Sequence, residues 1–356
     1  MIFRIGRTSL LDAVSAVLPI VPRRASVEVL THMRVVGDGS TLSLTADDRQ
    51  SVCIHSQPLE CEPFEVIIDP RKLSKILGEV TDGDVEIEVD EGSFVVRDSA
   101  GECVLLTRAE DWPAANVIDA CPGWTIDAPD FERAFRLCRC SVGDFENTVK
   151  AIQVSTGDGV LLFSSTDGHR ISYCPVPAES TSGDFDCTVL VPVSTMAAAT
   201  KGDGQTVVVN FGDSGGIRIR NGSLSIFTPG LNCRKARRLA VSPDVTVSIV
   251  AGDLVSALKR SMVFSDDDFL DLDFSPTGIL LASSGQSGNA STHVGCACSG
   301  KLGPITVNPH YVLEAITAFG LLTEVRLHYA GEGSPLFITT DDGFEYAIAA
   351  IARSAQ

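Results

Sequence analysis

The sequence predicts an α+β protein made of three copies of one unit, each with two helices packed on antiparallel sheets. Internal repetition, alternating hydrophobic strands and recurrent helix starts predict this fold class. With 356 residues the chain is long enough for several domains, each with its own core. The predicted domains are 1–121, 122–244 and 245–356.

Each predicted unit opens with a short strand, a polar turn and an amphipathic helix, at residues 3–18, 125–139 and 247–262. A shift of 121 residues superposes Ile5 on Ile126, and a further shift of 123 reaches Ile249. Apolar residues in the helices recur at the i, i+3, i+4 spacing of one buried face. The repetition therefore predicts one strand-helix element three times.

Alternating strand pairs follow each first helix and include residues 41–45, 160–164 and 278–282. Period-two alternation bounded by Gly and Asp is typical of antiparallel hairpins. Each unit then supplies a second helix, and two of these begin with Asp69-Pro70 and Asn308-Pro309. The Asp or Asn side chain can cap the helix, and Pro fits its first turn. Further strands close each unit, among them 84–89, 207–211 and 325–329.

The charge of the chain is unevenly distributed. A net charge of −18 argues against a protein that coats nucleic acid with its whole surface, because phosphate neutralisation needs clustered Lys and Arg. The predicted helices and the loop with Arg23 and Arg24 nevertheless carry +5, which leaves −23 on the rest. One such helix alone would usually be an ordinary solvated face. Agreement among the three units favours a localised basic surface. The helical segments counted are 8–18, 70–79, 130–142, 193–201, 252–264 and 308–319.

Composition predicts a cytoplasmic protein without metal or cofactor. No segment approaches the roughly 18 apolar residues of a membrane span, and residues 1–7 do not resemble the start of a secretory signal. The 11 Cys residues form no regular framework, so free thiols are expected. The pairs Cys138-x-Cys140 and Cys296-x-Cys298 lack further ligands at zinc spacing.

One segment carries a specific resemblance. Thr166-Asp167-Gly168-His169-Arg170-Ile171 resembles the Thr-Asp-Gly-His-Arg-Leu signature of the bacterial DNA polymerase III beta subunit, the sliding clamp. An Asp-Gly turn alone is usually just a hairpin. The resemblance continues in the same order over essentially the whole chain. It includes residues 39–45, Asp47, the turn 111–113, residues 236–239, the helix from Asn308 to Ala315 and the last strand from Tyr346.

The resemblance implies the DNA clamp fold and a ring-shaped head-to-tail homodimer lined by helices. Such a ring would hold double-stranded DNA topologically, without reading its sequence, and tether the replicative polymerase. Arg24 and Arg71 match positions that touch DNA in the family, whereas the loop 143–148 departs from the family pattern by carrying acids. With the helix charges, the expected DNA-binding residues are Arg23, Arg24, Arg71, Lys75, Arg133, Arg136, Lys201, Lys259 and Arg260.

The family also implies a hydrophobic cleft that receives short linear motifs of the polymerase, the clamp loader and repair factors. Here residues 349–353 read Ala-Ala-Ile-Ala-Arg where Met-Pro-Met-Arg-Leu is usual, and Arg234 replaces a common proline, which predicts a reshaped pocket. By position, the walls would be Val149, Thr166, Gly168, His169, Arg170, Ile171, Arg238, Leu239, Ala347, Ala349 and Ile351. The dimer interface would involve Cys103, Leu105, Val263 and Phe264.

An enzyme is the main competing class. The acids at 266–268, with Asp271 and Asp273, could hold Mg²⁺, but a loop running into an alternating strand explains them more simply. Residues 285–289 lack the second Gly and the context of a nucleophile elbow. His169 lies close to Asp167 in sequence only, and no glycine-rich phosphate motif appears.

The sequence therefore predicts a non-catalytic subunit. A second alternative keeps the fold but makes the protein a diverged accessory clamp for repair or a mobile element, because the cleft and the loop 143–148 are altered.

Overall fold

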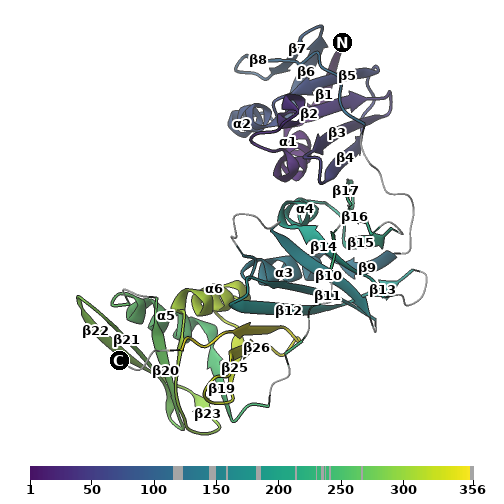
Figure 1. The fold of residues 1–356 in the computed structure, drawn as a ribbon. Coiled ribbons are helices and arrows are strands. Elements are labelled where there is room, and N and C mark those ends of the chain that lie inside the picture. Colours follow the sequence, from purple (N-terminus) through teal and green to yellow (C-terminus); the bar gives the residue numbers. More distant parts are fainter. Residues whose placement is uncertain are drawn as a thin grey trace. The chain divides into compact units, whose positions relative to one another are not determined.

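The chain divides into two compact units. Unit 1 comprises residues 1–132, 156–159 and 177–233, and unit 2 comprises residues 133–155, 160–176 and 234–356 (Figure 1). The predicted boundaries between three domains stay a prediction. The computed structural model describes residues 1–114, 123–143, 150–157, 159–181, 186–212, 215–229, 231–233, 236, 238–239, 242–265 and 268–352.

Unit 1 contains a small antiparallel sheet in the order β1-β6-β7-β8. In β6, buried Val85, Ile87 and Val89 alternate with more exposed acids, which is the period-two pattern of a sheet with one face in the core. β8 lies at the edge of this sheet. The strands are β1 (Ile2–Gly6), β6 (Asp84–Asp90), β7 (Ser93–Arg97) and β8 (Glu102–Leu106).

A second, nine-stranded sheet of unit 1 follows the order β13-β9-β15-β16-β17-β4-β3-β2-β5. β17 pairs antiparallel with β4, with Leu224 opposite His55, so strands from two predicted domains share one sheet. The strands are β2 (Met33–Gly37), β3 (Thr41–Asp47), β4 (Val52–Pro58), β5 (Phe64–Ile68), β9 (Gly123–Asp127), β13 (Glu179–Ser180), β15 (Thr206–Phe211), β16 (Ile217–Asn221) and β17 (Leu224–Thr228). β14 (Thr188–Pro192) pairs antiparallel with β18 (Leu231–Asn232).

The helices of unit 1 pack on one face of the nine-stranded sheet or on each other. α1 (Arg7–Val17) contacts α2 (Pro70–Glu79), β3 and β4, and α4 (Val193–Ala199) contacts β16 and β17. The predicted start of α2 is confirmed, because the Asp69 carboxylate accepts hydrogen bonds from the backbone N–H groups of Arg71 and Lys72. Two 3-10 turns complete the unit, η1 (Leu18–Ile20) and η2 (Glu28–Thr31).

Unit 2 also holds two antiparallel arrays. One runs β10-β11-β12-β27-β26-β25-β19-β23, and the other β22-β21-β20-β24. The first contains β10 (Ala151–Gly157), β11 (Val160–Thr166), β12 (Arg170–Pro177), β19 (Val245–Val250), β23 (Ala297–Cys298), β25 (Glu324–Tyr329), β26 (Leu336–Thr339) and β27 (Glu345–Ile348). The second contains β20 (Leu270–Ser275), β21 (Gly278–Gly285), β22 (Gly288–Gly295) and β24 (Leu302–Val307).

Most of α3 (Ala128–Arg139) lies in unit 2, together with α5 (Ala251–Met262) and α6 (Pro309–Phe319). α5 packs against α6, β21 and β22. Asn308 caps α6 by accepting a hydrogen bond from the His310 N–H at 2.9 Å, as the sequence predicted. A strand leads directly into a helix at β1–α1, β9–α3 and β19–α5, which is the predicted repeated element.

Within the described ranges, no helix is long and apolar enough to cross a membrane.

Candidate DNA-facing surface and partner cleft

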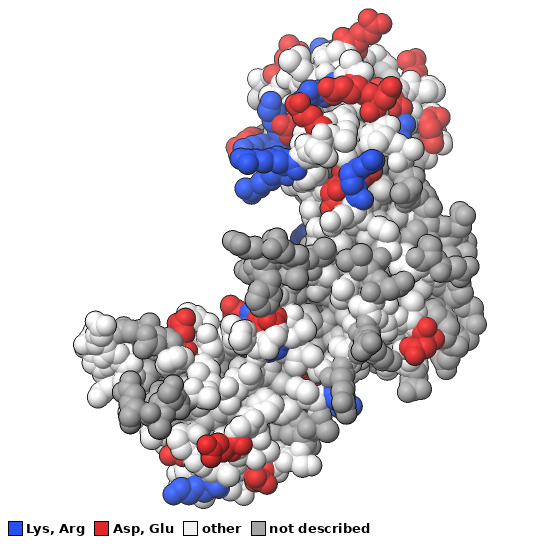
Figure 2. All heavy atoms as spheres, viewed as in Figure 1, with Lys and Arg blue, Asp and Glu red and all other residues white. Residues whose placement is uncertain are grey.

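Several predicted DNA-binding cations of unit 1 lie around α2. The Arg71 guanidinium donates a hydrogen bond from Nη2 to the Val21 carbonyl at 2.6 Å. This bond holds the loop with the exposed Arg23 and Arg24 near α2, where Lys75 is also exposed. Figure 2 shows Lys and Arg gathered over the part of unit 1 that contains α1 and α2. Loop and helix residues thus form one cluster of cations, and an electrostatic contact with phosphates requires such clustering.

The remaining predicted cations are mostly exposed at helix ends. Lys201 follows α4, and Lys259 and Arg260 lie in the last turn of α5. Arg136 is exposed on α3, whereas Arg133 is only 24% exposed and forms an ion pair with Asp342. Arg133 therefore contributes less net positive charge than its helical position predicts. Its partner is distant in sequence, so no local pattern indicated the pair.

The Asp-Gly-His-Arg motif folds into a turn closed by its own carboxylate. Asp167 Oδ1 accepts hydrogen bonds from the backbone N–H groups of His169 at 2.9 Å and Arg170 at 3.0 Å. Gly168 adopts φ +89°, a conformation that favours glycine. Thr166 Oγ1 accepts from the Gly168 N–H and donates to the Arg170 carbonyl. The motif thus fixes the backbone at the start of β12.

The Arg170 side chain holds this turn against α6. Its Nε donates to Asp167 Oδ2 at 2.7 Å and its Nη1 to Glu314 Oε2 at 2.5 Å. The guanidinium carbon lies 4.1 Å from the centroid of the Tyr311 ring, within cation–π range. Arg170 is 10% exposed. The described contacts make Arg170 a positioning residue for the β12 end of the predicted cleft.

Pairing of β12 with β27 joins several predicted cleft residues. Ile171 lies opposite Ala347, and the Ala349 N–H donates to the His169 carbonyl at 2.8 Å. Phe337 on β26 lies opposite Ala347 from the other side. Because directly opposed residues share a sheet face, Ile171, Ala347 and Phe337 form one apolar row.

A hollow of about 480 Å³ adjoins this row. The Arg238 guanidinium forms two hydrogen bonds across it to the Glu345 carboxylate, one of them from Nε at 2.8 Å. Arg238 and Leu239 are predicted cleft residues, whereas Phe337 and Glu345 are not, although strand alternation places Phe337 and Glu345 on one face. The lining residues are Arg238, Leu239, Pro243, His328, Phe337, Thr339 and Glu345.

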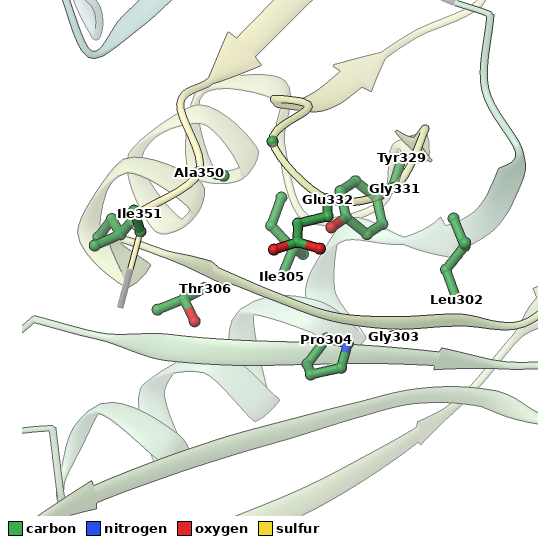
Figure 3. Close-up of a pocket in the computed structure, with 12 residues that line it drawn as sticks. Leu302, Gly303, Pro304, Ile305, Thr306, Tyr329, Gly331, Glu332, Ala350 and Ile351 are labelled. Carbon is green, nitrogen blue, oxygen red and sulfur yellow. The ribbon is translucent and has the colours of Figure 1, made fainter. Parts of the chain in front are cut away.

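Ile351 lies at a different hollow. Its N–H donates to the Thr306 carbonyl at 2.8 Å, which lays the C-terminal segment beside β24. Ala350, Ile351 and Ala352 line a pocket of about 650 Å³ together with β24, Tyr329 and the turn around Glu332. Figure 3 shows the Glu332 carboxylate over β24, with Ile351 at one end of the pocket and Leu302 at the other. Val149, the remaining predicted cleft residue, lies outside the described residues.

The residues predicted for the dimer interface lie on or near two sheet edges. On β8, Cys103 is exposed, but the Leu105 side chain is only 5% exposed and faces the core. Its neighbours Val104 and Leu106 are 55% and 80% exposed, so they carry the accessible apolar surface. In unit 2, Val263 after α5 is 70% exposed. Phe264 lies beside Gly288 at the start of β22, the edge strand of its sheet.

The sequence features that could indicate an enzyme have structural roles in the folded protein. Residues 285–289 form the turn of the β21–β22 hairpin and the start of β22, not a strand-turn-helix elbow. Asp271 on β20 accepts a hydrogen bond from Thr306 Oγ1 at 2.5 Å. Burial raises the pKa of the Cys140 thiol to about 12 and also raises that of Cys138, so both stay protonated at neutral pH. Asp266 and Asp267 lie outside the described residues.

The fold is that of sliding clamps. A crystal structure of the DNA polymerase III subunit beta from Pseudomonas aeruginosa matches 99% of this chain and 100% of its own, with a TM-score of 0.86 and 22% identity. A crystal structure of the DNA polymerase III beta subunit from Thermotoga maritima also matches 99% of this chain and 100% of its own, with a TM-score of 0.88 and 14% identity.

Sequence comparison finds relatives of the same kind. Residues 1–115 match the family model described as DNA polymerase III beta subunit, N-terminal domain. The chain is 25% identical to the beta sliding clamp of Pseudomonas aeruginosa, with 98% of each chain covered. It is 24% identical to a beta sliding clamp homolog from Streptomyces muensis, with 89% and 88% covered. Residues 1–115 therefore match the N-terminal domain of the DNA polymerase III beta subunits, and nearly the whole chain is similar to beta sliding clamps, which are non-catalytic processivity factors in DNA replication.

Proposed function

We propose that two copies of this chain join head to tail in the cytoplasm as a ring around double-stranded DNA and tether the replicative polymerase. The observation that carries the proposal is the exposure of Lys and Arg on helices and their adjoining loop in a chain of net charge −18. Cations confined to such surfaces attract phosphates without selecting a base sequence. The names of the relatives do not favour the accessory-clamp alternative.

The test of encirclement uses DNA topology. After loading onto circular DNA by its cognate clamp loader, the protein should stay bound when salt is raised and should leave when the DNA is linearised. Simple electrostatic binding predicts the opposite, namely loss with salt regardless of DNA ends. Retention on linear DNA with free ends would overturn the ring proposal.

We further propose that the row of Ile171, Ala347 and Phe337, with Leu239 in the adjoining hollow, anchors short linear motifs of polymerase, loader and repair partners. A few apolar side chains in a groove of this kind can dominate the affinity for a peptide. Ala347 in this row and Ala349, which stands where the family has Met, leave space for a large partner side chain.

A peptide carrying the clamp-binding motif of the cognate polymerase tests the cleft. Leu239→Asp should weaken binding by at least about tenfold, because a charge would replace an apolar wall. Leu321→Asp is the matched control, since Leu321 is similarly exposed but lies in the turn after α6. Equal binding by wild type and Leu239→Asp, or equal loss in both variants, would contradict this assignment.

A further inference from the structure

Two arginines that pair with no carboxylate of the described residues lie on the face of the nine-stranded sheet that is opposite to its helices. On β16, Ile217, Ile219 and Asn221 are buried, and Asn221 Nδ2 donates to the Ala199 carbonyl of α4. Arg218 and Arg220 alternate with them and therefore face the other way. Neither arginine forms an ion pair with any residue that the structure describes.

The surroundings of Arg218 hold its guanidinium in place. Its carbon lies 5.0 Å from the centroid of the Phe227 ring, on the neighbouring strand β17. Phe227 is only 4% exposed. The buried Nε of Arg218 has no hydrogen-bond partner among the described atoms. The Phe227 ring thus packs against the Arg218 guanidinium, which still has hydrogen-bond donors without a partner among the described atoms.

A third arginine on the same face provides a contrast. Arg34 on β2 binds Glu65 of β5 through two hydrogen bonds of 2.8 Å each. Burial, followed by the nearby charge of Arg220, lowers the pKa of Arg218, whereas the hydrogen bonds that Arg34 donates to Glu65 raise the pKa of Arg34. Guanidinium groups stay charged at neutral pH in either case. Within the described part of the chain, the pair on β16 therefore lacks the carboxylate partner that Glu65 supplies to Arg34.

We propose that Arg218 and Arg220 bind an acidic segment of another protein, whose carboxylates pair with the two guanidinium groups. Alternate residues on a strand are about 6.6 Å apart, and acidic residues at alternate positions of an extended segment repeat at the same distance. Guanidinium groups bind carboxylates through paired hydrogen bonds. This surface is separate from the helices proposed to face DNA and from the partner cleft, so it goes beyond the proposed function.

Single-stranded nucleic acid is the weaker candidate for this site. Such binding usually combines a longer basic groove with exposed aromatic rings on which bases stack. Here the aromatic ring beneath Arg218 is buried, and the site offers two cations in a strongly acidic chain. A short acidic segment needs only the two ion pairs.

The experiment measures binding of a short fluorescein-labelled peptide that alternates glutamate and serine, by fluorescence anisotropy with the full chain at low ionic strength. The double variant Arg218→Gln/Arg220→Gln should bind at least about tenfold more weakly than wild type. The single variant Arg220→Gln, at an exposed position, should show part of this loss without a change in melting temperature. Arg34→Gln is the matched control on the same face and should keep affinity within about twofold.

Three outcomes would overturn the proposal. Peptide affinity could be unchanged in the double variant, or fall equally in Arg34→Gln, which would indicate general electrostatic attraction. An oligothymidylate of the same charge could bind more tightly than the peptide and be lost in the double variant, which would assign the site to nucleic acid. Loss confined to Arg218 and Arg220 with preference for the peptide supports the proposal, whether or not the chain forms a ring.

Discussion

Leu106→Ala is expected to weaken the proposed ring without unfolding unit 1. The Leu106 side chain is 80% exposed at the end of edge strand β8, so its removal costs little folding energy. In a head-to-tail dimer this strand would lie along the edge strand β22 of the second copy, and Leu106 would become buried. The substitution therefore separates assembly from folding.

The magnitude follows from the area that becomes buried. Alanine lacks three carbons of leucine, and at about 0.8 kcal/mol per buried methylene the loss is about 2 kcal/mol at each interface after allowance for the exposed fraction. A ring of two copies contains the interface twice, which makes the loss about 4 kcal/mol. The dimer dissociation constant should then rise about a thousandfold.

Sedimentation equilibrium over a range of protein concentrations measures this constant, and thermal unfolding of the monomer reports on folding. Leu322→Ala is the control, because Leu322 is 96% exposed in the turn before β25 and belongs to neither of the two edge strands. A wild-type dimer that Leu106→Ala leaves intact, or that Leu322→Ala weakens equally, would refute the interface assignment.

Four further predictions concern stability and DNA retention. Arg170→Ala should lower the free energy of unfolding by about 2–4 kcal/mol in urea titrations, because Asp167 loses its buried partner; an unchanged midpoint would contradict the positioning role. Asp69→Ala should cost about 1 kcal/mol in the same assay through loss of the α2 cap, and Asp69→Asn should retain most of it. Burial lowers the pKa of His55 below its ordinary 6.5, so the contribution of neutral His55 to stability is present above pH 6.5 and lost as pH falls through the folded-state pKa. The difference in melting temperature between wild type and His55→Gln should therefore be smaller at about pH 5 than at about pH 8. Reversing the charge with Arg24→Glu or Lys75→Glu should lower the amount of protein loaded onto circular DNA at moderate salt, while the lifetime after loading, which ring closure sets, stays the same; equal loading would argue against these contacts.

The helices were the most predictable part of the fold, because their signals are local. Asp69-Pro70 and Asn308-Pro309 each combine a capping side chain with a residue suited to the first turn, and both helices begin there. The strand-to-helix elements were also predictable, since burial on one helix face leaves a periodic record in the sequence. The pairing of β17 with β4 was not predictable, because alternation along a strand indicates which face is buried but does not indicate which strand lies beside it.

The site was less predictable than the fold. Arg238 and Glu345 are far apart in sequence, and only the folded sheet brings their charges together. Arg133 looked like a free cation by helical position, but its pairing with Asp342 depends on tertiary structure. Positions carried over from the family grouped Ile351 with Leu239, whereas the two side chains line different hollows. The hydrogen bond from the Ile351 N–H to the Thr306 carbonyl, which no local sequence pattern indicates, decides this placement.

The continuity of the nine-stranded sheet has a consequence for fragments of the chain. A protein that ended at residue 121 would lack β17, so the backbone N–H and C=O groups along one side of β4 would lose their partners. It would also lose the hydrogen bonds from Thr228 to the Gln50 carbonyl and between Ser51 and Thr195. Sequence repetition here does not imply autonomous folding, and the N-terminal repeat expressed by itself should aggregate through that unprotected strand.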